Sequence, residues 1–438
     1  MSIKEDFQSF CENIQPNNID TMKVTVGEIA KKLNKSYYNL DKDNTSNMYI
    51  VGSVGRETAI KGVSDLDLIF DLPNETFKKF DAYTSNGQSA LLQEVKGILV
   101  ERYPKTKISG DGQVVVIEFT NYIVELVPGF KQSDDSFKYP DTNNGGSWRI
   151  TKPLAEIAES KRMSEETDKN FKYIANMLRA WKNKQGFKFG GLLIDTLTCN
   201  FLNKNEEYKN ISFDDYFEMS KELFKYLKDL NKDQKYWYAL GSNQEVYNSA
   251  NGKFVKKAKK AYNKIKDLAS DSEEVNSKLR EIFGNEFPKG EATNEMASIY
   301  KSYSERTYRN TEQFVEDLFP IDIRYDLNIE CKVTQDGWRP ELLSNLLKNR
   351  SWLSKNKKLE FYIVDTDAKG DYDIYWKVRN VGSEAIKRDM IRGQIIKTNN
   401  TKHFERTDFR GEHFVECYIV KNGVCVAKDE IDVPISAY

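Results

Sequence analysis

Two aspartates and a glycine–serine pair have residue types and spacing suited to phosphate and metal chemistry. Asp65 and Asp67 lie two residues apart in an apolar run, so on a strand both side chains leave the same face. Their Cα atoms would be about 6.6 Å apart, close enough to share a pair of metal ions. Gly52 and Ser53 come about a dozen residues earlier. Glycine lets the backbone approach a ligand, and the serine hydroxyl and nearby N–H groups can donate to phosphate oxygens.

A third carboxylate is needed to hold two metal ions about 3.5–4 Å apart. Glu125 is the best candidate, because its neighbours Val124 and Leu126 would point to the opposite face of a strand. With two Mg²⁺ or Mn²⁺ ions, such a site would clamp a triphosphate and lower the pKa of a ribose hydroxyl. In-line attack on the α-phosphate would expel pyrophosphate, with Glu125 as the expected general base.

The alternative interpretation is structural, since a lone Asp-x-Asp is more often the solvated face of a strand. Here a strand, a Gly-Ser turn, a short helix and an Asp-x-Asp strand follow one another, and a further strand carries Glu125. This combination is far more specific than any of its parts. It favours a nucleotidyl-transfer site.

Strands and helices that could position these residues are visible in the pattern. Residues 5–35 have apolar positions at helical spacing, interrupted near Pro16, and predict a short helix followed by a longer one. Residues 48–52 and 65–71 predict buried strands. Residues 111–127 predict a hairpin that ends at Pro128-Gly129.

The rest of the chain changes character twice. From about residue 150 to 320 the apolar spacing is helical. From Tyr325 short alternating strands return, with Asn422-Gly423 as a hairpin turn. We therefore expect three domains. They are a catalytic core with N-terminal helices (1–155), a helical lobe that completes the cleft (156–324) and a small α+β domain (325–438).

Composition limits the chemistry and the location. The net charge of −1 makes the whole chain a poor polyanion binder, and two histidines nearly exclude a His-ligated zinc site. The five cysteines form no CxxC pair and are expected to be reduced thiols. No apolar run of the ~18 residues needed to span a bilayer and no secretory signal are seen. We expect a cytoplasmic protein, with no membrane partner, that is a monomer.

Residues 52–70, GSVGRETAIKGVSDLDLIF, closely resemble the signature of bacterial cGAS/DncV-like nucleotidyltransferases (CD-NTases, SMODS), which make cyclic oligonucleotide signals in CBASS antiphage defence. The resemblance implies an α/β (α+β) nucleotidyltransferase fold with a polymerase-beta-like core and a helical lobe. It also assigns roles to individual residues. The implied metal and catalytic residues are Asp65, Asp67 and Glu125, and the implied nucleotide-binding residues are Gly52, Ser53, Arg56 and Arg179.

Two positions depart from the family pattern. Glu125 stands where aspartate is more usual, and Arg179 stands where lysine often precedes the helix tryptophan. An arginine can still pair with phosphate, but a solvated helix arginine is an equal alternative.

The C-terminal stretch resembles a second unit, the adenylyl/guanylyl-cyclase- and SMODS-associated C-terminal sensor (AGS-C) domain. Matching segments include residues 337–340, 376–380 and 413–418. The middle of the chain, about 190–320, resembles the family only loosely.

Taken together, the resemblances imply synthesis of a cyclic di- or trinucleotide from ATP and/or GTP or other NTPs, read by a downstream effector. One rival is an enzyme on the same fold that makes linear oligonucleotides or modifies RNA or protein. The other rival is a non-catalytic RNA or nucleotide sensor, which would have no need for three carboxylates.

Two weaker features lie in the middle region. Five lysines at helical spacing could form an RNA or phosphate patch that takes an activating RNA, although a solvated amphipathic helix is the more ordinary explanation. They are Lys253, Lys256, Lys257, Lys260 and Lys264. The aromatic run Tyr236-Trp237-Tyr238 could stack on a nucleobase, but core packing is the expected role.

Overall fold

The computed structural model describes residues 2–436 except 42, 291–311, 336, 338 and 350. Contacts divide the chain into two compact units, each assembled from two segments. The first is Met1–Trp181 with Phe189–Pro288, and the second is Lys182–Lys188 with Lys289–Tyr438. The predicted core and most of the predicted helical lobe thus fall in one unit, and the three-domain boundaries at 155 and 324 stay a prediction.

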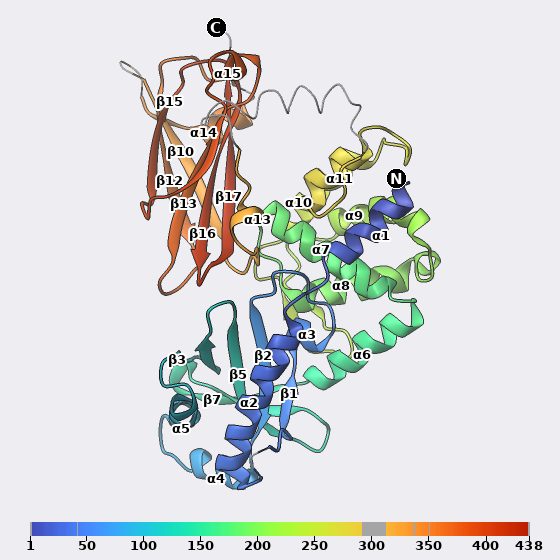
Figure 1. The fold of residues 1–438 in the computed structure, drawn as a ribbon, viewed down its shortest axis with the longest axis vertical. Coiled ribbons are helices and arrows are strands. Elements are labelled where there is room, and N and C mark those ends of the chain that lie inside the picture. The colour runs from blue at the N-terminus through green and yellow to red at the C-terminus, as the bar shows by residue number, and fades with distance from the viewer. Residues whose placement is uncertain are drawn as a thin grey trace. The chain divides into compact units, whose positions relative to one another are not determined.

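The first unit is built on a mixed sheet that holds the candidate carboxylates. Its main strands run in the order β1-β2-β5-β4-β3, and β6 and β7 extend it from β5 (Figure 1). β2 and β5 are parallel, and the other pairs are antiparallel. The strands are β1 Met48–Ile50, β2 Asp65–Asp71, β3 Lys107–Asp111, β4 Val114–Glu118, β5 Ile123–Lys131, β6 Phe137–Asp141 and β7 Ser147–Thr151.

Helices α2 (Ile19–Tyr38) and α5 (Gly87–Arg102) cover one face of this sheet and share a core with it. Leu66 and Leu68 of β2 point into that core and have no exposed surface. Burial of each leucine side chain stabilises the fold by about 1.5–3 kcal/mol. This fixes which residues of β2 face the core. Ile69 points to the other face and packs with Ile157 of α6 (Pro153–Glu166). The alternation of β2 therefore sends its odd-numbered side chains away from α2 and α5.

Helices make up most of the rest of the first unit, together with a two-stranded hairpin of β8 and β9. The buried stripes of α7, α8 and α9 form much of its apolar interior. The elements are α1 Ile3–Asn13, α3 Gly52–Gly55, α4 Asn74–Asp81, α7 Asn170–Gln185, α8 Gly191–Lys204, α9 Tyr216–Asp229, β8 Tyr236–Tyr238, β9 Glu245–Tyr247, α10 Lys253–Ile265 and α11 Val275–Phe283, with 3₁₀ turns at Asn143–Gly145, Glu206–Tyr208 and Phe213–Asp215.

The second unit is rich in β-structure, with short helices at its margins. Two four-stranded antiparallel sheets run β11-β10-β12-β15 and β14-β13-β16-β17, and they share one apolar core. The elements are α13 Val315–Leu318, β10 Leu327–Thr334, β11 Glu341–Leu342, α14 Leu343–Lys348, β12 Lys358–Thr366, β13 Asp373–Arg379, α15 Ser383–Lys387, β14 Arg392–Lys397, β15 Lys402–Arg406, β16 Gly411–Lys421 and β17 Val424–Ile435.

Most predicted elements are confirmed. The break near Pro16 separates α1 from α2, and Asn422 and Gly423, both at positive φ, turn β16 into β17. The predicted end of the hairpin at Pro128-Gly129 is wrong, because β5 continues to Lys131. Pairing of β5 with β4 ends at Leu126 and pairing with β6 begins at Phe130. Pro128 lies between them, where β5 is paired with β2 on one side and is an edge on the other, and an edge tolerates proline.

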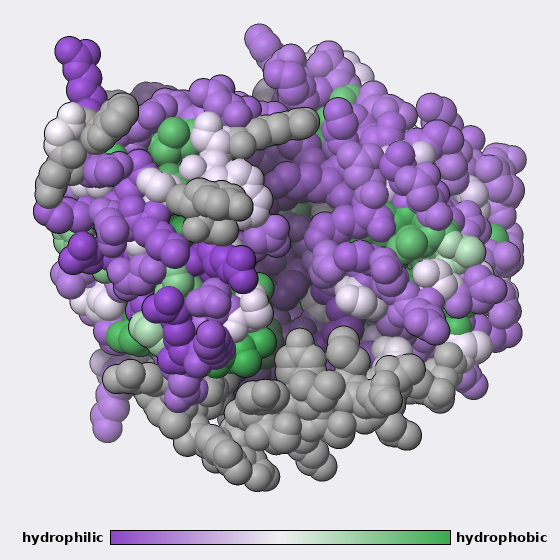
Figure 2. Space-filling model, turned by 90° about the horizontal axis from the view of Figure 1, so that it is seen from above, coloured by the Kyte–Doolittle hydropathy of each residue, from purple (hydrophilic) through white to green (hydrophobic). Residues whose placement is uncertain are grey.

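The surface is mostly polar. Figure 2 shows a face on which hydrophobic side chains form only small, separate patches, in keeping with charged residues making up 30% of the chain. Within the described residues, none of the helices has the length and apolar character to cross a bilayer. The five cysteines are buried free thiols, as expected.

Candidate active site

The candidate carboxylates sit at adjoining positions of two parallel strands. Asp65 and Asp67 alternate on β2 with core residues, and Asp67 pairs in register with Glu125 of β5. The flanking Val124 and Leu126 are fully buried, so Glu125 points to the same face as the aspartates. All three side chains are partly exposed. The sequence thus predicted their common face correctly, and the register of β2 with β5 sets Glu125 beside Asp67.

The backbone of the Gly-Ser turn lies directly against the Asp67 side chain. Gly52 has φ +62°, in the region that favours glycine, and a Cβ placed there would lie 1.8 Å from Asp67 Oδ2. The backbone N–H of Val51 donates to the carbonyl of Asp67 at 2.9 Å, which joins turn and strand. Ser53 begins the turn beside this contact and is partly exposed. Glycine is therefore required here because no side chain fits.

The three carboxylates have the donor chemistry of a Mg²⁺ or Mn²⁺ site, since hard divalent cations prefer oxygen ligands. Gly52 places no side chain of its own against the Asp67 carboxylate. In the part of the chain that the structure describes, no three His, Cys, Asp or Glu side chains are already gathered as a metal-binding group. The three carboxylates therefore suit a divalent metal ion in three respects: they are oxygen donors, they lie on one face of the sheet, and the strand register sets Glu125 beside Asp67.

Behind the turn lies a buried charge network centred on Asp195 of α8. Asp195 has no exposed surface, and its carboxylate accepts from Arg56 Nε at 2.8 Å and from Thr58 Oγ1 at 3.0 Å. Arg179 of α7 donates to both of its oxygens, at 2.6 and 3.0 Å. Burial by itself would raise the pKa of Asp195, but the Arg179 and Arg56 guanidiniums outweigh it and lower the pKa. Asp195 is thus a buried anion that ties the loop after Ser53 to α7 and α8.

Glu156 of α6 extends this network. Its carboxylate lies 3.7 Å from Arg56 and accepts from Ser242 Oγ at 3.1 Å. Burial raises the pKa of Glu156, and Arg56 opposes that shift. Ser242 belongs to the loop between β8 and β9. That loop is therefore linked, through two side chains, to the residue that follows the Gly-Ser turn.

Arg56 and Arg179, the predicted nucleotide-binding arginines, are both buried and both bound to Asp195. Arg179 also donates to the Gly191 carbonyl at 3.0 Å. In this structure the two arginines connect the Gly-Ser turn, α7 and α8 through Asp195. Their direct contact with a nucleotide stays a prediction. Sequence reasoning missed Asp195. The available signal was a single carboxylate inside the apolar run of α8, which must be paired if it is buried.

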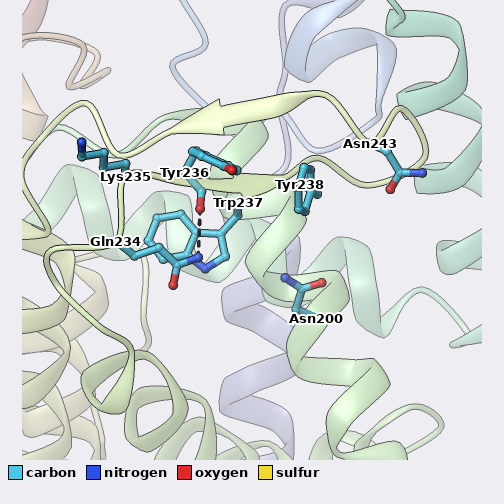
Figure 3. A pocket seen from close by; sticks show the side chains of 7 residues that line it. All are labelled: Asn200, Gln234, Lys235, Tyr236, Trp237, Tyr238 and Asn243. Atoms are coloured by element: carbon cyan, nitrogen blue, oxygen red, sulfur yellow. Dashed lines mark hydrogen bonds between the residues drawn. The ribbon is translucent and has the colours of Figure 1, made fainter.

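A cavity of about 610 Å³ lies beside the β8–β9 hairpin. Figure 3 shows Asn200 of α8 below the strand that carries Tyr238, and the Gln234 side chain donating to the Tyr236 carbonyl at 2.9 Å. The lining residues are Asn200, Gln234, Lys235, Tyr236, Trp237, Tyr238 and Asn243. Trp237 is buried against Phe254, as expected for core packing, whereas Tyr238 is 62% exposed. The cavity is thus lined mostly by polar side chains, among them three amides and the exposed ring of Tyr238.

The predicted lysine patch falls on α10. Phe254, Ala258 and Ile265 are buried, so the helix is amphipathic as expected. Lys256 and Lys260 are exposed, Lys264 pairs with Glu281, and Lys253 and Lys257 are partly exposed. The RNA-binding role of this face stays a prediction.

Comparisons with known proteins identify two domains in the chain. Residues 1–163 match the Second Messenger Oligonucleotide or Dinucleotide Synthetase (SMODS) domain, and residues 309–436 match the Adenylyl/Guanylyl and SMODS C-terminal sensor domain. A curated relative, the cyclic GMP-AMP synthase of Escherichia albertii, is 28% identical over 107 residues, which cover 24% of this chain and 23% of the relative. The match thus spans about a quarter of that protein.

Two solved structures are similar over the first two thirds of the chain. CdnC of E. coli MS115-1 with ATP has a TM-score of 0.50 at 15% identity, covering 65% of this chain and 98% of its own. A mutant of the di-nucleotide cyclase DncV of Vibrio cholerae has a TM-score of 0.45 at 13% identity, covering 66% of this chain and 87% of its own. The likeness to CdnC shows a nucleotidyltransferase fold.

The SMODS match and the fold together define a nucleotidyltransferase. More narrowly, residues 1–163 are a SMODS domain of the CD-NTase type, and residues 309–436 are an AGS-C sensor domain.

Proposed function

We propose that this protein joins nucleoside triphosphates, ATP and/or GTP or others, into a cyclic di- or trinucleotide second messenger and releases pyrophosphate. The observation that carries the proposal is the set of Asp65, Asp67 and Glu125 on one face of two paired strands, beside the Gly52–Ser53 turn. The SMODS match supports synthesis of an oligonucleotide signal. The name of the E. albertii relative is consistent with a cyclic product.

Each residue has a defined part in the proposed reaction. Asp65, Asp67 and Glu125 would hold two Mg²⁺ or Mn²⁺ ions, which when bound stabilise charge on the transferring phosphoryl group and make the attacking hydroxyl more acidic. The Ser53 hydroxyl and the backbone N–H groups of the turn would donate to the triphosphate. Glu125 would accept the proton of the ribose hydroxyl. The Asp195 network would keep the turn in place during repeated rounds of transfer.

The proposed setting is antiphage signalling, in which an effector responds to the cyclic product. An activating RNA held by the lysine face of α10 is part of the same proposal. Lys256 and Lys260, which are exposed one helical turn apart, are its best-placed residues.

The test is product analysis. Purified protein would be incubated with radiolabelled NTPs, singly and mixed, with Mg²⁺ or Mn²⁺, with and without RNA, and then treated with phosphatase. We expect a phosphatase-resistant small product that is absent from the double variant Asp65→Asn/Asp67→Asn and from samples with EDTA. Asp71→Asn is the matched control. Asp71 ends the same strand but binds the Lys131 N–H at 2.8 Å, and this variant should keep the product.

Other outcomes separate the alternatives. A phosphatase-sensitive product would point to linear oligonucleotides, and label in a macromolecule would point to RNA or protein modification. If no product formed with any NTP, metal or RNA, the synthase proposal would fail. A product seen only with RNA, and lost in Lys256→Glu/Lys260→Glu, would support the activating role of α10.

A further inference from the structure

The cavity of about 610 Å³ beside the β8–β9 hairpin is lined by none of the residues assigned to the proposed reaction. Its described lining comes from β8 and the two residues before it, from Asn243 in the hairpin loop and from Asn200 of α8, and includes no residue of β9. The cavity therefore borders the edge of β8 that faces away from β9. Its volume is typical of pockets that take small organic molecules.

This free edge of β8 presents backbone groups to the cavity. Backbone hydrogen bonds at Lys235 and Ala239 join β8 to β9. Because bonding to one neighbour alternates along an antiparallel strand, the backbone groups of Tyr236 and Tyr238 point to the other edge. The Tyr236 carbonyl is already taken there by the Gln234 side chain, at 2.9 Å. Tyr238 thus presents both its N–H and its carbonyl on the free edge.

Leu240 supports this direction of the strand. Its backbone N–H, two residues beyond that of Tyr238, donates to Thr196 Oγ1 of α8 at 3.3 Å. The even-numbered residues of the segment therefore turn their backbone groups towards α8, the helix that carries Asn200.

Polar side chains border the same space. Asn200 and Asn243 are exposed, and within the described residues their side-chain amides make no hydrogen bond. Each amide can both donate and accept. Of the described residues that line the cavity, Lys235 alone is charged, and it too is exposed. The lining therefore carries one positive charge.

Tyr238 adds an aromatic surface. Its side chain is 62% exposed, and it meets the Tyr236 ring edge to face, with centroids 5.5 Å apart. Trp237, between them, turns inward onto Phe254. Figure 3 shows Asn200 below Tyr238, so an open ring and an amide border one cavity.

We propose that this cavity binds an unpaired nucleobase, carried either by a free nucleotide or by a single-stranded RNA. The Tyr238 ring stacks on the base, and its backbone N–H and carbonyl bond to the edge of the base together with Asn200 and Asn243. Lys235 suits the one phosphate next to that base. A single cation is too little charge for a triphosphate, which separates this cavity from the proposed active site.

Two other ligand classes fit the cavity less well. An added peptide strand would gain few backbone bonds, because β8 has three residues and Gln234 takes one of its edge carbonyls. A neutral sugar could stack on Tyr238 but would leave the charge of Lys235 unused.

A base in this cavity would also restrain the hairpin loop. Asn243 follows Ser242, whose hydroxyl donates to Glu156 at 3.1 Å. Glu156 in turn lies 3.7 Å from Arg56, the residue after the Gly-Ser turn helix. The cavity is thus connected to the candidate active site, although binding of the base does not depend on synthesis of a cyclic product.

Photolabelling of the full-length protein with 8-azidoadenosine 5′-monophosphate tests the proposal. The reaction contains EDTA and no NTP, so the result is independent of catalysis, and mass spectrometry identifies the labelled peptides. We expect label within residues 234–243 or on the peptide that carries Asn200. Excess AMP should remove this label, and ribose 5-phosphate, which lacks the base, should not.

A single-stranded adenine hexanucleotide is the second competitor and distinguishes the two sources of the base. Competition at a lower concentration of bases than with AMP would assign the site to an RNA strand. Competition that is no better per base would assign it to a free nucleotide.

The variants locate the binding. Tyr238→Ala should weaken AMP binding at this cavity at least about fivefold, the loss expected when one base loses its stacking partner. Tyr238→Phe keeps the ring and should bind AMP as the wild type does. Asn200→Ala should also weaken binding. Tyr247→Ala is the matched control, because Tyr247 is 62% exposed on the same hairpin but does not line the cavity.

Labelling of residues 234–243 that is unchanged in both Tyr238→Ala and Asn200→Ala would overturn the assignment. So would label that appears on other peptides alone, such as those with Gly52 or Asp65. Ribose 5-phosphate that competes as well as AMP would show that the cavity does not recognise a base.

Discussion

At the scale of single residues, the closest constraint on the candidate site is the contact of Gly52 with Asp67. Gly52→Ala would place a methyl group 1.8 Å from Asp67 Oδ2 at φ +62°. The carboxylate must move, and the left-handed backbone adds about 1–2 kcal/mol of strain. We expect product formation to fall at least tenfold, with the melting temperature lowered by only a few degrees. Activity and melting curves of the variant check this.

Gly97→Ala is the control for that substitution. Gly97 lies inside α5, and an added Cβ would meet nothing within 4 Å. Alanine there should stabilise the protein by up to about 1 kcal/mol, because it is the better helix former, and leave activity intact. If Gly52→Ala kept wild-type activity, the turn would not be pressed against Asp67 as described.

The sequence predicts the position of a site residue where that position depends on spacing to its near neighbours in the chain. Asp65 and Asp67 share a face because the period of a strand is two, and Gly52 indicates a close approach. The sequence does not predict the place of Asp195, because its partners Arg56 and Arg179 lie far from it along the chain and only folding brings them together.

At the scale of elements, Asp195 holds a loop and two helices with one carboxylate. Asp195→Asn keeps the shape but leaves the guanidiniums of Arg56 and Arg179 buried without a counter-charge. We expect a loss of about 3–5 kcal/mol in the free energy of unfolding, measured by urea denaturation.

The control for Asp195→Asn is Asp229→Asn, at the end of α9, where the carboxylate is 60% exposed and pairs with Lys228. That change should stay within about 0.5 kcal/mol. If Asp195→Asn changed the free energy of unfolding as little, the hydrogen bonds to Arg56 and Arg179 would not depend on the negative charge of Asp195.

A second element-scale prediction concerns the two sheets of the second unit. Glu405 of β15 binds Arg392 of β14 through two bonds of 2.8 and 2.9 Å, and so joins one sheet to the other. Burial would raise the pKa of Glu405, but hydrogen bonds from His403 and Arg392 lower it to about 2. Its stabilising effect is therefore complete above pH 4.5 and is lost as the pH falls towards 2. That effect is on the order of 3 kcal/mol.

Acid denaturation of Glu405→Gln measures this contribution. The variant should be less stable than the wild type near neutral pH, and the difference should shrink as the pH approaches about 2. Glu341→Gln, at an exposed position of β11, serves as control and should follow the wild type throughout. A difference that stays constant with pH would contradict the assignment to Glu405 ionisation.

At the scale of the whole molecule, the second unit takes in a segment from the middle of the chain. Asn183 in that segment donates to the Ile321 carbonyl at 2.8 Å and accepts from the Ile323 N–H at 3.1 Å. Asn183→Ala would leave both backbone groups without this partner and should cost about 1–3 kcal/mol in unfolding of the second unit. Asn263→Ala, on the exposed face of α10, is the control. Calorimetry that resolves the two units, or limited proteolysis, would reveal the change.

The sequence predicted the class of both parts, because the motifs around Gly52 and Asp65 and the strands after Tyr325 are local signals. It did not predict that residues 182–188 belong with the C-terminal strands. Residues 182–185 end a helix whose pattern continues unbroken from Asn170, so nothing local marks the change of unit at Lys182.

The second unit is completed late in synthesis, because its two segments lie far apart along the chain. Residues 182–188 leave the ribosome about a hundred residues before Lys289, the start of the remainder of that unit. At ~5–20 residues per second this is a wait of about 5–20 s. The first unit can fold while translation continues, but the second cannot be completed until β17 has been synthesised. A polypeptide truncated anywhere before β17 would thus lack a completed sensor domain, however well its catalytic half had folded.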